Sequence, residues 1–558
     1  MFSLPSDRRD RWAILALGLF AFIYVVVLIS HAALGPTDDF VFLRTLQQGK
    51  PLLYYSSSFP YYDMYKIGRF SPLTAMEYNL VGLFSRSPDP AWYYAIHAIQ
   101  LLAFLVLMVA LLRSLKLSYR WSCLIAALLT LLPGFTFTWF RLQMTEHDVL
   151  IAFLVFLLAY LAEREKHRLS TFLVTLTAAN IALYYKETAF IAIGAFALAH
   201  QLLSRPPERL NLRRLDLLLI VSVLFYLFLY AVLILPGGGI LSYGKDAQSF
   251  LAVTFKNFLN YTFVSDSFLM LVIVPLALWR FIVLLRRRAE PEPIADALLF
   301  ASVAYIAGFA LLRFSSVYYF LPLYALALPA AFWLLRQKQY RKRGWKILIA
   351  VTIFCTAVNT IPLGLHQLTY YKYQSVNFNR ALDTIIADAR TRPAHARANI
   401  FLAGLNRGSG NWTYFIVSEF LQAKGLRADQ FDLRAEIEDE RKPKEQPLPL
   451  AVPKITLPYT VFQGDGPSQP TSGDYLIVGP LSNDPGRNSI SHTYLQSLET
   501  DYRLLYASRS RFELPQATLK EVGRLLVSSG ATPDQHFLGI SRKPPNWDSP
   551  DYYVFIKR

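Results

Sequence analysis

Two adjacent carboxylates, Asp38 and Asp39, follow the first apolar segment of the chain. Neighbouring like charges raise the pKa of one member, so such a pair can hold a proton or share a cation. Asp38 is therefore a candidate general base toward a hydroxyl group. The structural alternative is helix capping, because an Asp before the apolar run that begins at Phe40 makes a good N-cap. The two roles are compatible if Asp39 caps the helix and Asp38 acts as the general base.

A second cluster places His147 between Glu146 and Asp148, with Arg141 shortly before them. A histidine between two carboxylates can bind a metal ion, or its pKa can be raised by the neighbouring charges. The structural alternative is a solvated turn, in which none of these side chains has a special role. The sequence leaves both open.

Three further groups carry charge or aromatic rings. Lys186 and Glu187 interrupt an apolar stretch, where charges are unfavourable unless they are paired or functional; a turn at the membrane surface is the alternative. Arg313 has the planar fork that suits a phosphate, although an arginine can also snorkel at an interface. Tyr61 and Tyr62 can stack on sugars, and an aromatic belt at the membrane surface explains them equally well.

The elements that position these residues follow from composition. The chain has 558 residues, of which 54% are hydrophobic and only 17% charged, whereas soluble domains carry about 25% charged residues. This excludes a disordered chain, a collagen-like repeat and an ordinary soluble enzyme. The net charge of +17 lies mostly in short clusters between apolar segments, which indicates membrane topology rather than nucleic-acid binding. Cys123 and Cys355 both lie in apolar runs, so no disulfide framework or thiolate metal site is expected.

A membrane-spanning helix needs about 20 mostly apolar residues, and the sequence predicts about eleven such segments. They are Trp12–Ser30, Ala91–Leu112, Trp121–Phe140, Val149–Ala162, Leu169–Tyr185, Thr188–Leu203, Leu215–Leu235, Phe268–Leu285, Ala297–Leu312, Val317–Leu335 and Trp345–Leu363.

Six basic clusters set the orientation, because cytoplasmic loops carry an excess of Lys and Arg. They precede the first segment and follow the second, fourth, sixth, eighth and tenth. The N-terminus is therefore predicted to be cytoplasmic, and everything after about residue 364 lies on the opposite side. A cleavable signal peptide is the alternative for the first segment, but its apolar stretch exceeds the usual length of about 7–15 residues.

The predicted fold is a polytopic α-helical membrane protein with a C-terminal soluble α/β domain. Residues 1–363 form the transmembrane domain, with 31–90 as its first extracytoplasmic loop, and residues 364–558 form the extracytoplasmic domain. Alternating strands and a helix indicate the α/β class. The predicted elements are strands at Asn399–Leu405, Tyr475–Gly479, Arg503–Ser508 and Tyr552–Lys557, a helix at Trp412–Ala423 and a proline-rich loop at Arg441–Pro470.

In this order, the elements resemble the GT-C glycosyltransferases, the group that includes protein O-mannosyltransferases and the lipid A aminoarabinose transferase. Three features carry the resemblance: the pair Asp38-Asp39 in the first outer loop, Glu146 or Asp148 in the second, and the segment Arg313–Tyr324. That segment is similar to the Arg…Tyr-Leu-Leu-Pro pattern of the later helices of these enzymes. The acidic pair departs from the family, in which Asp-Glu is common.

The resemblance implies transfer of a sugar from a polyprenyl-phosphate donor to an acceptor outside a bacterial cytoplasmic membrane, with inversion at the anomeric carbon. Asp38 would act as base, Arg313 and Lys186 would bind the donor phosphate, and Glu146, His147, Asp148 and Glu187 would form a second acidic site. The acceptor, a glycan, a lipid or a protein, and any divalent metal cofactor remain open. The alternatives are a polysaccharide polymerase or ligase, which would need an essential Arg or His in a late loop, and a transporter, which predicts inverted repeats.

Overall fold

The computed structural model describes residues 7–36, 39, 70–84, 89–142, 144–204, 210–235, 265–311, 318–337, 340, 343–393, 397–403, 416–435, 470–479, 495, 497–508 and 551–558. Of the predicted site residues, Asp38, Tyr61, Tyr62 and Arg313 lie outside this part of the chain. The predicted loop up to Pro470 also lies almost entirely outside it.

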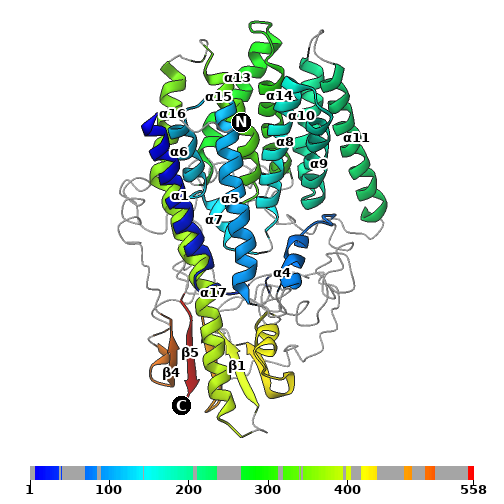
Figure 1. The fold of residues 1–558 in the computed structure, drawn as a ribbon. Coiled ribbons are helices and arrows are strands. Elements are labelled where there is room, and N and C mark those ends of the chain that lie inside the picture. Colours follow the sequence, from blue (N-terminus) through cyan, green and yellow to red (C-terminus); the bar gives the residue numbers. More distant parts are fainter. Residues whose placement is uncertain are drawn as a thin grey trace.

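The molecule consists of a helical bundle and a small sheet joined by one long helix (Figure 1). The helices of the bundle before the long helix are α1 (Arg8–Ile29), α5 (Pro90–Ser114), α6 (Tyr119–Leu129), α7 (Pro133–Trp139), α8 (Glu146–Lys166), α9 (Leu169–Tyr185), α10 (Ala189–Leu203), α11 (Leu210–Leu233), α13 (Val274–Leu285), α14 (Pro293–Leu311) and α15 (Tyr324–Leu335). Short helices η1 (Met76–Tyr78) and α4 (Asn79–Phe84) lie beside the bundle at the end nearer the sheet, here called the sheet-side end.

Each of the eleven predicted segments overlaps a helix. By length and composition, five helices among the described residues can cross a membrane, or six if the bent pair α6–α7 counts as one span. Four other apolar helices are shorter, at 10–17 residues. The chain therefore fits a multi-pass membrane protein, and the number of crossings stays a prediction.

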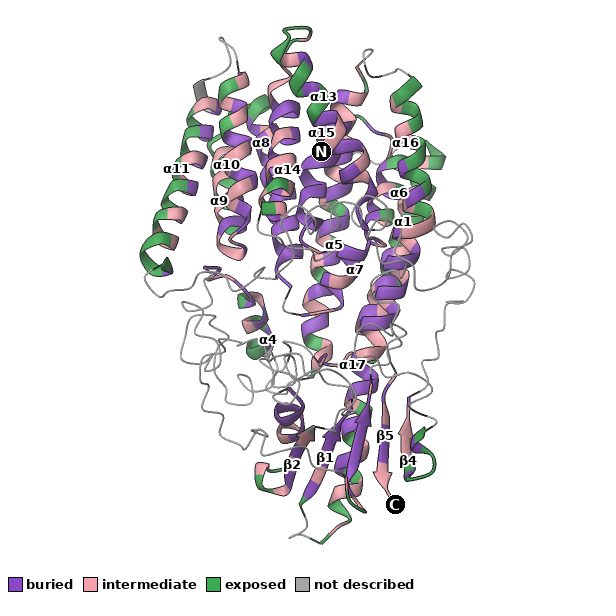
Figure 2. Cartoon of the chain, turned by 180° about the vertical axis from the view of Figure 1, so that it is seen from behind, coloured by how far each residue is buried: buried purple, intermediate pink, exposed green. Residues whose placement is uncertain are grey.

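Burial agrees with a lipid-exposed bundle. The interior surfaces are buried, whereas the outer faces of α11, α13 and α16 (Arg343–Cys355) are exposed (Figure 2). On α11 the exposed side chains include Val221, Leu224, Phe225 and Phe228. Large apolar side chains facing outward along a whole helix match a hydrocarbon surrounding and not water.

The third predicted segment, Trp121–Phe140, was expected as one helix, and this is wrong: α6 and α7 are bent by 66°. Pro133 is the cause, since it has no N–H to donate into the preceding turn and pushes Leu132 into an extended conformation, with ψ of 146°. The long helix that contains Gly364 packs very closely against this bend, because a Cβ on Gly364 would lie 1.8 Å from the Leu131 carbonyl oxygen.

The last predicted segment continues well past Leu363. Helix α16 (Arg343–Cys355), the π-helical turn η7 (Thr356–Thr360) and α17 (Ile361–Arg390) form one helical run of 48 residues that reaches the sheet (Figure 1). The apolar pattern of the sequence did not predict the second half of this run, because α17 is polar where it extends beyond the bundle. The Lys372 ammonium donates to the carbonyl oxygens of Val27 at 2.6 Å and Leu28 at 3.3 Å, which caps the end of α1.

The sheet contains β1 (Ala398–Leu402), β2 (Phe431–Ala435), β3 (Tyr475–Val478), β4 (Tyr502–Ala507) and β5 (Tyr553–Lys557), in the order β2-β1-β3-β5-β4. Strand β1 pairs in parallel with β2 and β3, whereas β5 pairs antiparallel with β3 and β4. Four strands overlap the predicted ones, and β2 was missed. The predicted helix Trp412–Ala423 is helical at 416–423, and its first part lies outside the described residues.

Alternation along the strands explains how the sheet meets the long helix. Ile400, Ile477 and Val554 belong to the main core together with Ile385 of α17. Their neighbours Phe401, Leu476 and Phe555 form a separate core on the opposite face. Because side chains alternate between faces of a strand, one face of the sheet packs on α17 and the helix ties the sheet to the bundle.

Candidate functional site

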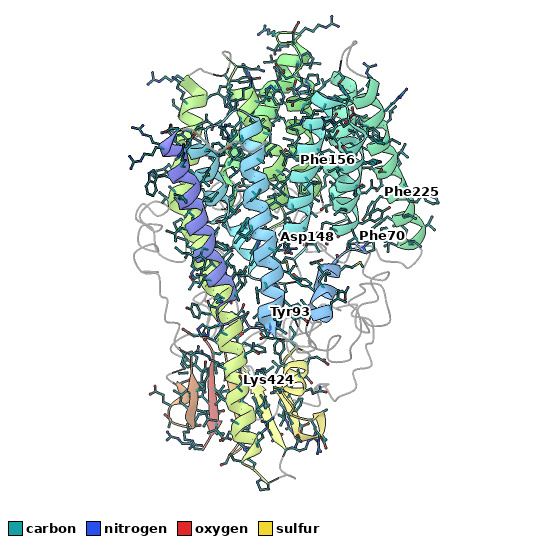
Figure 3. All side chains as sticks on the ribbon, viewed as in Figure 1. Phe70, Tyr93, Asp148, Phe156, Phe225 and Lys424 are labelled. Atoms are coloured by element: carbon teal, nitrogen blue, oxygen red, sulfur yellow. The ribbon has the colours of Figure 1, made fainter. Side chains whose placement is uncertain are left out.

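Buried ionisable side chains gather at the sheet-side end of the bundle. Asp148 marks the place in Figure 3, where it lies nearer the sheet than Phe156 and farther from it than Tyr93. Helices α5, α8 and α9 and the short helix η1 all contribute polar groups here, so the site is assembled from four separate parts of the sequence.

Glu146, His147 and Asp148 form the first turn of α8, with side chains turned into the protein. Their exposed fractions are 1%, 0% and 8%, so the alternative of a solvated turn is wrong. Two carboxylates in a first turn interact favourably with the positive end of the helix dipole. Apolar residues on both sides of the turn then bury it, which the local sequence does not indicate.

Lys186 compensates one of these charges. It ends α9, in a short turn before α10, and its Nζ lies 2.8 Å from Glu146 Oε1. The alternative in which Lys186 meets water at the surface is also wrong, because the residue is 7% exposed. Glu187 is the next residue of this turn and is half-buried. The ammonium also lies 5.4 Å from the centre of the Tyr319 ring.

Glu77 joins the site and was missed by the sequence analysis. Ligand atoms of Glu77, His147 and Asp148 all lie within 4.8 Å of one another; we call these three residues the carboxylate–histidine cluster. The Tyr185 hydroxyl donates to Glu77 Oε2 at 3.1 Å. The one signal in the sequence is that Glu77 is the sole carboxylate in residues 72–84.

Burial governs the electrostatics of Glu77. It raises the pKa of the Glu77 carboxyl to about 7, against hydrogen bonds that lower it, among them the one from Tyr185. Burial and then the charges of Glu77, Asp148 and Asp39 raise the pKa of the neighbouring Tyr78 hydroxyl above its ordinary value. Asp39 and the two carboxylates of the cluster therefore all act on the Tyr78 hydroxyl.

The two histidines of the site differ in what their ring nitrogens do. His97 Nδ1 lies 2.8 Å from the Trp139 carbonyl oxygen, which can only accept, so Nδ1 carries a proton. His97 Nε2 contacts the Tyr78 hydroxyl, which also donates to the Leu142 carbonyl oxygen at 2.6 Å. His147 packs against the His97 ring at 4.6 Å. Neither His147 nitrogen makes a hydrogen bond within the described part of the chain, although Nε2 lies 3.3 Å from Asp148 Oδ2. His97 therefore has a structural role, whereas His147 is a candidate ligand for a metal ion.

Asp39 is the one member of the predicted acidic pair that the structure describes. It is 2% exposed, and its Oδ2 accepts from the Gly35 N–H at 2.7 Å. The segment that leads to it is held by α17, because Asn379 donates to the Leu34 carbonyl oxygen at 2.8 Å. Asp39 is therefore buried, and its position is fixed from both sides.

A helical membrane bundle with buried carboxylates and a buried histidine at one end defines a polytopic membrane protein with a candidate enzyme site. Comparison of sequences finds no family model and no curated protein that matches the chain.

In fold, the chain is similar to the oligosaccharyltransferase of Archaeoglobus fulgidus in its apo form, with 14% sequence identity and a TM-score of 0.41 over 75% of this chain and 64% of that chain. A structure of that enzyme tethered to an acceptor peptide containing the NVT sequon gives 14% identity and a TM-score of 0.40 over 74% and 63%. The chain thus spans less than two thirds of their length. A likeness this distant describes shape and leaves activity, substrates and partners to be proposed.

Proposed function

We propose that this chain is an integral-membrane glycosyltransferase that moves a sugar from a polyprenyl-phosphate donor to an acceptor outside a bacterial cytoplasmic membrane. The observation that carries the proposal is the cluster of half-buried Glu77 with buried His147 and Asp148 at the sheet-side end of an apolar bundle. A donor with a lipid tail reaches such a site from the bilayer, and burial excludes the water that would hydrolyse it.

The reaction needs one base and one stabilised leaving group. An acceptor hydroxyl oxygen attacks the anomeric carbon, the bond from that carbon to the phosphate oxygen breaks, and the polyprenyl phosphate departs with the electron pair. The hydroxyl proton passes to the carboxylate of Asp38, beside the buried Asp39. In-line attack inverts the anomeric configuration. Arg313 is assigned to the donor phosphate; Lys186, whose charge is balanced by Glu146, is assigned to holding that carboxylate in place.

The proposed orientation puts the sheet and the site on the same, extracytoplasmic side. This follows from the basic clusters of the sequence and from the position of the cluster at the sheet-side end of the bundle. A reporter active only outside the cytoplasm, fused after Arg558, should therefore give signal. Activity of a cytoplasm-only reporter at the same point would contradict the proposal, since a donor presented outside would not reach the site.

A divalent cation fits the carboxylate–histidine cluster. One imidazole and two carboxylates suit Zn²⁺ or Mn²⁺ better than Ca²⁺, and both nitrogens of the buried His147 lack a hydrogen-bond partner among the described residues. Ligands at about 2.1 Å from one ion lie at most about 4.2 Å apart, close to the 4.8 Å seen, so small side-chain movements would close the set. When bound, the ion supplies positive charge for an anionic leaving group.

Binding of the cation is testable without any substrate. The purified chain in detergent is dialysed against Zn²⁺ or Mn²⁺, and bound metal is counted by mass spectrometry. We expect one ion per chain for the wild type, and loss of that ion in His147→Ala and Glu77→Gln. His167→Ala is the control, because His167 follows the opposite end of α8. Equal metal content in His147→Ala and the wild type would refute the site.

The transfer reaction is tested in a deletion strain complemented with variants at equal protein level. Lipid-linked sugars are measured by mass spectrometry, and the donor should accumulate when transfer stops. Removing a general base typically lowers the rate by about 10²–10⁴-fold, so Asp38→Asn should behave like the deletion. Asp383→Asn, on the exposed part of α17, should behave like the wild type. No accumulation in the deletion strain, or normal turnover in both Asp38→Asn and Asp39→Asn, would contradict the proposed function.

A further inference from the structure

Arg141 is a positive charge without an ion-pair partner among the residues that the structure describes. It follows α7 by two residues and is half-buried, and its Nε is buried without a hydrogen-bond partner in the same part of the chain. No hydrogen bond joins its guanidinium to a described residue. Lys186, a buried cation of the same site, is by contrast balanced by Glu146 at 2.8 Å.

Aromatic rings hold the guanidinium in place. Its central carbon lies 4.5 Å from the centre of the Phe137 ring and 5.8 Å from that of Tyr371 on α17. Tyr318 stacks on Phe137 at 4.5 Å, and the Tyr371 ring meets Phe137 edge-on at 4.9 Å. Cation–π contacts orient a guanidinium but leave its N–H groups, which lie in the plane of the fork, able to donate.

Two tyrosines near the guanidinium also lie near acidic groups of the site. Tyr94 interacts electrostatically with both Asp39 and Arg141, and Tyr318 interacts with both Glu146 and Arg141. Neither carboxylate is within ion-pair distance of Arg141 in the part of the chain described here. The Arg141 Nε–H is buried and has no hydrogen-bond partner among the described residues, so it is a donor available to an anion.

We infer that Arg141 binds a phosphate oxygen of the lipid-linked substrate. The inference rests on the proposed function and deepens it, by adding Arg141 to the contact with the donor phosphate that is proposed for Arg313. Two parallel N–H groups of a guanidinium match two phosphate oxygens, and burial of the pair strengthens their attraction.

The experiment measures phosphate binding without sugar transfer. Purified protein in phosphatidylcholine nanodiscs is titrated with decaprenyl monophosphate, and in a second arm with phosphatidic acid, which carries the same phosphate monoester on a different lipid. Loss of a charged hydrogen bond typically corresponds to about 10–100-fold in affinity. We expect Arg141→Gln to weaken decaprenyl phosphate binding by that factor and Arg141→Lys, which keeps the charge but not the fork, to weaken it less.

Two controls separate binding from folding. Arg164→Gln removes another arginine that lies over a ring, Trp333, at the opposite end of α8, and should bind decaprenyl phosphate as the wild type does. The thermal midpoint of Arg141→Gln in detergent should not fall, because the variant loses a charge that no described partner balances. A lower midpoint together with unchanged affinity would make Arg141 structural and overturn the inference.

The remaining outcomes distinguish this inference from the proposed function. The inference alone is overturned if purified Arg141→Gln binds decaprenyl phosphate as tightly as the wild type, while the strain with Asp38→Asn still accumulates the lipid-linked sugar. Arg141-dependent binding of decaprenyl phosphate without any sugar transfer supports the phosphate site and rejects the proposed function. Equal Arg141-dependent binding of phosphatidic acid would identify the ligand as a membrane-lipid headgroup and overturn the assignment to the donor.

Discussion

The buried ion pair between Lys186 and Glu146 should be essential to the stability of the bundle. Its atoms are 2.8 Å apart, and the two side chains are 9% and 1% exposed. At an effective dielectric constant of about 20, two unit charges at this distance attract by about 6 kcal/mol. Replacing Lys186 with Met leaves the Glu146 charge buried without its partner, which typically costs about 3–5 kcal/mol.

The assay is equilibrium unfolding of the purified chain in mixed detergent micelles, followed by tryptophan fluorescence. Lys186→Met should lower the free energy of unfolding by about 3–5 kcal/mol. The double variant Glu146→Met/Lys186→Met should recover most of this loss, because replacing both members of a buried pair with apolar side chains is often close to neutral. A double-mutant cycle then isolates the interaction between the two residues.

An exposed pair of the same chemistry provides the matched control. Lys424 Nζ lies 2.7 Å from Asp383 Oδ1, but the side chains are 23% and 59% exposed, and Figure 3 shows Lys424 beside the sheet. Lys424→Met should cost no more than about 1 kcal/mol, since water screens such pairs. The reasoning from burial is refuted if Lys186→Met and Lys424→Met lower stability equally, or if the double variant is no more stable than Lys186→Met.

Two further predictions use the same unfolding measurement. Gly364→Ala should lower stability by about 1–3 kcal/mol, because its methyl group would lie 1.8 Å from the Leu131 carbonyl oxygen and α17 must shift; Gly344→Ala, with nothing within 4 Å, should be neutral or slightly stabilising, and equal effects would contradict the close approach. Asp296→Asn should cost about 3–5 kcal/mol, because Arg280 Nε lies 2.6 Å from Asp296 Oδ1 with both side chains fully buried; an unchanged stability would show that the arginine finds another partner.

Helix positions could be predicted from the sequence because they depend on local properties. An apolar run of sufficient length specifies a membrane-compatible helix whatever surrounds it, so each predicted segment overlaps a helix. Helix ends were predicted less well for the same reason. The apolar run ends near Leu363, but α17 continues to Arg390 because its later turns pack on the sheet. The bend at Pro133 was readable from that residue alone and was overlooked.

The sequence by itself determined the chemical types at the site: carboxylates, a histidine and cations within an otherwise apolar chain. Only the tertiary structure decided how they combine. Glu77 meets His147 and Asp148 across a wide separation in sequence, and Lys186 pairs with Glu146 instead of facing water. Such contacts depend on which helix faces pack together, and packing is a property of the whole bundle. A pattern local to each segment therefore indicates which residues are charged, whereas packing of the folded chain decides which of those charges are buried and which of them are paired.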